Sequence, residues 1–151
     1  MPFITTSVPL DHMMPPYERF ATLMLPVVWL DDETGLTHTA HAGMITDGAS
    51  VPRMFWRLIP PFRSHYLAAA MIHDHYCYKA MTMPPGDDRE FVRREADAQF
   101  ARMCGDLGAG YAMRLTLHRS VAIGSFLSRN DPVAPDYIRQ PAEFRDWILS
   151  R

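Results

Sequence analysis

The sequence has few cysteines, no long apolar run and no excess of positive charge. Its two cysteines, Cys77 and Cys104, form no C-x-x-C pair, which argues against a zinc cage or a disulfide scaffold. No segment approaches the roughly 18 apolar residues of a membrane span, and the N-terminus lacks the pattern of a secretory signal. The 15 basic and 17 acidic residues form no basic stripe, so nucleic acid is not the favoured partner. We therefore expect a protein that is made in a cytoplasm.

What is present is enough apolar material for one domain and many prolines near both ends. The chain has 151 residues, and 48% of them are hydrophobic. This is enough for a single core that needs no disulfide bonds or structural metals. Four prolines within residues 1–19 remove backbone donors too often for a central strand, so this segment is predicted to be an extended lead-in. We predict a single domain over residues 20–127, followed by an extended tail over 128–151 with a short helix from Ala142 to Leu149.

The first half of the domain has a strand pattern. The run from Phe20 to Leu30 predicts a strand in which Pro26 moves one part to an edge or a bulge. The residues at 31–35 supply a turn, and the segment from Leu36 to Met44 returns as a second strand. Together these two segments predict a small antiparallel sheet.

The second half of the domain has three helix patterns. Ser64 is a candidate N-cap for a helix from His65 to Ala80, which stops before the prolines at 84 and 85. A second helix is predicted from Asp87 or Asp88 to Cys104. A third, from Ala109 to Leu127, is apolar around much of its girth, which suggests that it is the central one. The predicted fold class is α+β, with a small N-terminal antiparallel sheet followed by a three-helix core.

A histidine and two aspartates on the helices are the best candidates for chemistry. His73 shares a helix face with small and apolar groups, so it is positioned to be buried. Asp97 on the next helix comes within reach of His73 if the two helices form an antiparallel pair. A buried imidazole needs a partner to fix its tautomer, and Asp97 is the candidate. In this hypothesis His73 is the general base of a hydrolase.

The neighbouring residue Asp74 is a candidate metal ligand. Together with Asp47 or the carbonyl of Gly48, its carboxylate would suit a hard cation such as Ca²⁺, with Zn²⁺ as the alternative. A water between His73 and the metal would then be the nucleophile.

Each feature also has a purely structural interpretation. The pair Asp47 and Gly48 is commonly a turn or cap. Asp97 could be a salt-bridge partner of Arg93 or Arg94, and the His73 network could fix the helix arrangement without catalysing anything. The remaining histidines are interpreted as ordinary, including His38, His41, His65, His75 and His118.

Three segments together resemble a phage and prophage family of unknown function. They are the Thr-Asp-Gly-Ala-Ser-Val-Pro loop at 46–52, the Ala-rich helix with His73 and Asp74, and the Glu-Ala-Asp sequence ending at Asp97. The resemblance covers roughly residues 24–127. It implies a phage origin and does not by itself imply a reaction.

The segment around His73 is also similar to the paired helices of secretory phospholipases of type A-two. In that family a helical histidine activates water, the next aspartate binds calcium, and an aspartate on the partner helix supports the histidine. The resemblance assigns these roles to His73, Asp74 and Asp97. The glycine-rich calcium loop and the dense cysteine framework of that family are absent here.

Helix geometry predicts the state of the two cysteines. If His73 faces Asp97 across antiparallel helices, Cys77 and Cys104 are separated by about 16 Å along the helix axis. Bridged Cα atoms lie within about 7 Å, so two free thiols are expected.

Two functions compete at this point, beside a third class that no residue singles out, a host-interaction protein that blocks a defence system. The first is a metal-assisted hydrolase acting on an envelope component, either a lipid ester or a peptidoglycan bond. The second is a structural virion component of the tail or baseplate, whose Pro-rich termini contact other virion proteins. In the second case the protein is made in the host cytoplasm and incorporated in the virion, and the His-Asp-Asp cluster only locks the core.

Overall fold

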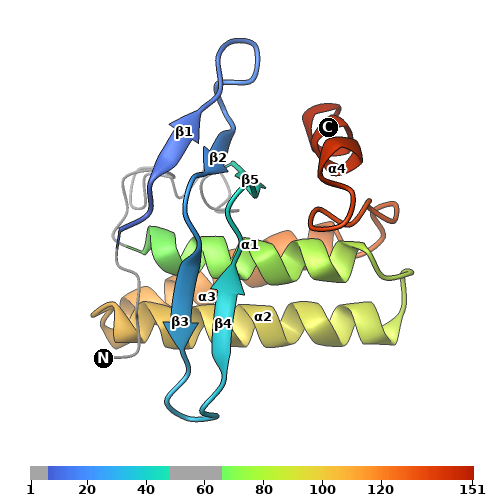
Figure 1. The fold of residues 1–151 in the computed structure, drawn as a ribbon. Coiled ribbons are helices and arrows are strands. Elements are labelled where there is room, and N and C mark those ends of the chain that lie inside the picture. The colour runs from blue at the N-terminus through green and yellow to red at the C-terminus, as the bar shows by residue number, and fades with distance from the viewer. Residues whose placement is uncertain (1–6, 48–65) are drawn as a thin grey trace.

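The chain folds into strands followed by helices, as the predicted α+β class requires (Figure 1). The computed structural model describes residues 7–47 and 66–151. The strands are β1 (Leu10–His12), β2 (Ala21–Leu23), β3 (Val27–Leu30), β4 (Thr37–Ala40) and β5 (Ile45–Thr46). The helices are α1 (Leu67–Met81), α2 (Asp87–Asp106), α3 (Tyr111–Leu127) and α4 (Pro141–Leu149). The predicted N-cap Ser64 lies outside the described residues.

The strands form two small antiparallel sheets where the sequence predicted one. One has the order β1-β2-β5, and the other is the hairpin of β3 and β4, in which Val27 pairs with Ala40. The strand expected from Phe20 to Leu30 is therefore two strands, which separate just before Pro26, a residue with no N–H for a ladder. β1 lies inside the expected lead-in, and it takes an edge position of its sheet.

α1 is the central helix, so the prediction that the helix at 109–127 is central is wrong. Most of α1 is buried, including Ala68, Ala69 and Ala70, whose small side chains allow close approach. α2 packs beside α1, α3 packs against α2, and the β3–β4 hairpin crosses the helices (Figure 1). α3 instead leaves Tyr111 80% and Leu127 75% exposed. The apolar composition of α3 therefore did not indicate how deeply this helix is buried.

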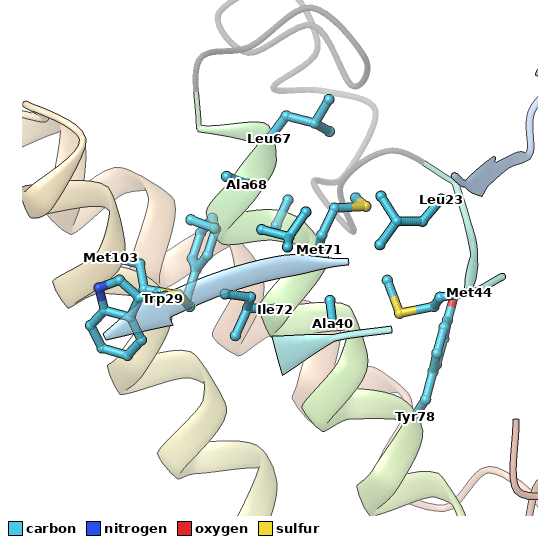
Figure 2. Packing of buried hydrophobic residues seen from close by; sticks show 14 of the residues in the cluster. Leu23, Trp29, Ala40, Met44, Leu67, Ala68, Met71, Ile72, Tyr78 and Met103 are labelled. Carbon is cyan, nitrogen blue, oxygen red and sulfur yellow. The ribbon is translucent and has the colours of Figure 1, made fainter. Parts of the chain in front are cut away.

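The core lies between the hairpin and the first two helices (Figure 2). Trp29 of β3 is 1% exposed, and its indole N–H donates to Asp106 Oδ2 of α2 at 2.8 Å. Met71 and Ile72 of α1 are fully buried below the hairpin. These contacts fix α1 against the hairpin, and His73 directly follows Ile72 on this helix.

The C-terminal segment packs onto its own domain. Phe144 of α4 is 2% exposed, and its ring centroid lies 4.8 Å from that of Tyr78 in α1. The buried Arg89 donates to the carbonyls of Ala80 and Met81 at the end of α1 and to that of Asp131. These bonds satisfy carbonyls that a helix end leaves open. Among the described residues, no helix is long and apolar enough to cross a membrane.

Candidate functional site

His73 and Asp97 meet across the two packed helices, as their spacing predicted. Nε2 of His73 lies 2.7 Å from Asp97 Oδ1, and the two residues are each 3% exposed. Ser125 of α3 donates its hydroxyl to the same carboxylate oxygen at 3.0 Å. The alternative of an Asp97 pair with Arg93 or Arg94 is wrong, because Arg93 donates to the Ser125 carbonyl and Ser128 Oγ and Arg94 pairs with Glu90 at 4.0 Å. Three helices therefore contribute one side chain each to this network.

Cys77 and Asp74 of the same helix also lie close to the His73 ring. Nδ1 lies 3.7 Å from Cys77 Sγ and 3.9 Å from Asp74 Oδ1. Sγ is nearly equidistant from the two ring nitrogens, at 3.7 and 3.6 Å, so it is not in line with a single N–H direction. His73 and Cys77 also line a pocket of about 200 Å³ between α1, α2 and α3. The ring is thus buried, but it borders a space that can hold a small molecule.

The surroundings of His73 favour its charged form. Burial lowers the pKa of the imidazole, but Cys77, Asp74 and Asp97 together raise the pKa well above the ordinary value of 6.5. The imidazolium is therefore the resting form at neutral pH. Any neutralisation of the Asp74 charge favours the neutral ring, which can accept a proton.

Asp74 contacts the first residue of the loop that the sequence singled out. Its Oδ2 accepts a hydrogen bond from Thr46 Oγ1 at 2.8 Å. Asp47 follows directly and keeps part of its surface exposed at a pocket of about 210 Å³. Desolvation and the nearby charge of Asp74 raise the pKa of Asp47 to about 6. The structure therefore places two mutually repelling carboxylates near one another.

Two of the three candidate metal ligands, Asp74 and Asp47, lie in the described part of the chain. Gly48, the third candidate ligand, lies outside the described residues. Within residues 7–47 and 66–151, no three His, Cys, Asp or Glu side chains gather closely enough to hold a metal ion. The group that contacts Asp74 Oδ2 is the hydroxyl of Thr46, an oxygen donor of the kind that hard cations such as Ca²⁺ prefer.

A family profile matches residues 21–121, which include β2 to β5, α1, α2 and the first part of α3. The chain belongs to this family. Its description is protein of unknown function (DUF1353). The matched range contains His73, Asp74 and Asp97 but not Ser125, β1 or α4.

One relative of this DUF1353 chain is the uncharacterized protein y4jT of Sinorhizobium fredii (strain NBRC 101917 / NGR234). The two sequences are 46% identical over 48 residues, which is 31% of this chain. The matched segment is only 14% of the length of the relative. None of the solved structures matches this chain.

Sequence reasoning missed three residues of this region of the DUF1353 fold. Cys77 was expected only to be a free thiol, although its position four residues after His73 places the two on one helix face. Arg93 precedes Asp97 by four residues, and it lines the same pocket as His73. Ser125 gave no local signal, because only the packing of α3 brings it to Asp97.

Both cysteines are free thiols, as the helix register predicted. Burial raises the pKa of the Cys104 thiol to about 12, so this residue behaves as a small apolar side chain. Cys77 is half-buried and borders the pocket.

A second buried histidine, His75, is paired with the C-terminal segment. The Tyr137 hydroxyl donates to His75 Nδ1, and the His41 ring lies 5.6 Å away between centroids. Burial, followed by the charges of His41, Lys79 and His38, lowers the pKa of His75 to about 4. The interpretation of His75 as ordinary therefore overlooked a group that must stay neutral in the folded protein.

This shift predicts a loss of stability in mild acid. The unfolded chain binds a proton at His75 near pH 6.5, whereas the folded chain does so only near pH 4. The free energy of unfolding should therefore fall by up to about 3 kcal/mol between these two values. Replacement His75→Gln keeps an acceptor for Tyr137 and does not titrate, so urea denaturation of this variant should depend less on pH in that window. The same slope in both proteins would disprove the assignment.

Proposed function

We propose that this protein is a hydrolase of phage origin in which His73 activates water against an envelope component, either a lipid ester or a peptidoglycan bond. The observation that carries the proposal is the His73–Asp97 contact of 2.7 Å beside a pocket that the His73 ring lines. A histidine that is oriented by a carboxylate and borders a cavity is suited to proton transfer.

In this proposal each ring nitrogen of His73 has its own role. Asp97 accepts the N–H of Nε2, which holds the neutral ring in the tautomer with a free lone pair on Nδ1. Nδ1 would then take a proton from water, and Asp97 would stabilise the imidazolium that results. Because the pKa of His73 is raised, the reaction should become faster as the pH rises above the ordinary histidine range.

We further propose that Asp74 and Asp47 bind a cation, with Ca²⁺ favoured by their oxygen donors. Support comes from the repulsion between the two carboxylates, which contributes to the raised pKa of Asp47. A bound cation would supply charge stabilisation near the reacting group.

The second candidate is a virion component in which the cluster only locks the core. The burial of His73, Asp74 and Asp97, each 2–3% exposed, favours it. The proposed use of the C-terminal tail as a contact to other virion proteins has less support, because Phe144 and Tyr137 pack on α1 of the same chain.

The test is an assay of the wild-type protein on phospholipid vesicles and on purified peptidoglycan, with EDTA, Ca²⁺ or Zn²⁺ added. We expect hydrolysis of one substrate that EDTA abolishes and Ca²⁺ restores. Activity that survives EDTA would reject the cation site and keep the role of His73. No hydrolysis of either substrate under any condition would favour the structural alternative.

A further inference from the structure

His75 is a buried histidine with one ring nitrogen left free. The residue is 9% exposed, and its Nδ1 is bonded to the Tyr137 hydroxyl. Within residues 7–47 and 66–151, its Nε2 has no hydrogen-bond partner. The unpartnered Nε2 of His38 is sealed from solvent, whereas Nε2 of His75 keeps some accessible surface. A buried polar side chain thus has one atom that is open to a partner from outside the chain.

His75 lines a cavity of about 240 Å³ at the end of α1. Lys79 and Thr82 follow it at spacings of four and three residues, so all three share one helix face. His41 and the segment 136–138 form the rest of the wall. Because Nδ1 is occupied by Tyr137, Nε2 is the polar atom that the His75 ring offers to this cavity. Pockets for drug-sized ligands have about 300–1,000 Å³, so this cavity suits a smaller group.

The His75 ring offers a hydrogen-bond donor to the cavity. Burial raises the pKa of the Tyr137 phenol, so the phenol keeps a proton that it can donate to Nδ1. The backbone N–H of His41 acts on the same phenol oxygen from its acceptor side and opposes that rise in pKa. Because the pKa of His75 is about 4, its ring is neutral at neutral pH, and its own hydrogen is on Nε2.

Positive charge surrounds this donor. After burial, the charges of His41 and Lys79 are the largest influences that lower the pKa of His75, so both act at the ring. Lys79 is the only lysine in the chain. In the described part of the chain, its ammonium has no carboxylate within ion-pair distance. The cavity therefore combines a neutral donor with a cation that has no counter-ion.

Two negative features near the cavity are already compensated. Asp136 lines it, but Oδ1 of this residue accepts the backbone N–H groups of Ile138 and Arg139 at 2.9 and 3.1 Å. The carbonyls at the C-terminal end of α1 accept hydrogen bonds from the Arg89 guanidinium, whose charge offsets the negative end of the helix dipole. The remaining unpaired groups favour an anionic ligand.

We propose that this cavity binds a phosphate group, with its oxygens on Nε2–H of His75 and on the ammonium of Lys79. Lysine binds phosphate as a point charge, and the neutral donor fixes one oxygen. The two donors belong to separate side chains one helical turn apart, so they do not form the parallel pair that matches a planar carboxylate. Neither residue is part of the His73 network, and this site does not depend on the proposed hydrolysis.

The experiment is an NMR titration of the wild-type protein at neutral pH and constant ionic strength, with inorganic phosphate and glycerol 3-phosphate in separate arms. Phosphate should shift the ¹³Cε signal of the single lysine and the Nε2 signal of His75 saturably at millimolar concentration. Acetate should not. Tighter binding of the free ion or of the monoester identifies the source of the phosphate group and supports the proposal in either case.

Three results of this titration would overturn the proposal. The first is no saturable shift with either phosphate compound. The second is an acetate affinity equal to that of phosphate, which would remove the selectivity. The third is a His75 ring whose hydrogen is on Nδ1 in long-range ¹H–¹⁵N spectra, because Nε2 would then be an acceptor.

Variants of two exposed basic residues supply the matched comparison. Lys79→Met removes the ammonium and should weaken phosphate binding about tenfold or more, whereas Lys79→Arg should retain most of the affinity. Arg119→Met on α3 removes the same charge outside the cavity, so it should bind phosphate as the wild type does. Equal affinity in Lys79→Met and Arg119→Met would overturn the proposal. If Lys79→Met does not fold, the wild-type titration with phosphate and acetate still decides the question.

Discussion

Replacement His73→Gln is expected to lower the rate of hydrolysis by about 10²–10⁴-fold, which is the usual contribution of a positioned general base. Glutamine has a similar reach and can still donate to Asp97, but it cannot take a proton from water. The fold should survive, because Asp97 keeps the hydrogen bond from Ser125 and gains one from the glutamine amide. The measurement is the initial rate on the substrate that the wild-type protein hydrolyses.

The control is His118→Gln on α3, which changes a half-buried histidine outside the His73 network. Its rate should equal that of the wild type. Circular dichroism and the thermal midpoint must show that both variants are folded. A His73→Gln variant with the wild-type rate would show that the ring takes no part in the reaction, whatever its contact with Asp97.

Removal of the Asp97 carboxylate is the change with the largest expected effect on stability. In Asp97→Ala, the buried imidazolium of His73 loses its partner at Nε2, and the Ser125 hydroxyl loses its acceptor. Breaking a buried ion pair from one side typically costs about 3–5 kcal/mol, and we expect a loss in that range at neutral pH. Urea denaturation measures it, with Glu95→Ala on the exposed face of α2 as a control that should change stability by less than about 0.5 kcal/mol.

The pH dependence of this loss follows from the raised pKa of His73. The paired imidazolium stabilises the folded state fully below the unfolded pKa of 6.5, and this stabilisation disappears as the pH rises through the folded pKa. The difference between wild type and Asp97→Ala should therefore narrow in alkaline solution. A loss below about 1 kcal/mol at neutral pH would mean that the His73–Asp97 pair is not ionised.

Much of the helical part could be predicted because its signals are local. The prolines at 84 and 85 stop α1, and the acidic residues at 87 and 88 start α2, so both boundaries lie within a few residues of those expected. The burial order of the helices could not be predicted in this way. Alanines made α1 central because they admit close neighbours, whereas the larger apolar residues of α3 stay partly exposed.

The division of the strands between two sheets depends on long-range contacts, which the local sequence pattern does not contain. Pro26 was recognised as a disturbance, but only the pairing of β2 with β5 shows that the chain changes sheet there. The candidate site likewise has one contact that the sequence predicts and another that depends on tertiary packing. His73 and Asp97 could be paired from helix spacing alone, whereas the bond from Ser125 to Asp97 depends on how α3 packs against α2.

The central claim is that His73 and Asp97 act as one catalytic unit, and a double-mutant cycle on the hydrolysis rate tests it most directly. Asp97→Asn retains the volume of the side chain, and loss of its orienting charge should lower the wild-type rate by about 10–100-fold. In the His73→Gln background the same change should have almost no further effect. An equal loss in both backgrounds would contradict the claim, because the two residues would then influence the rate independently.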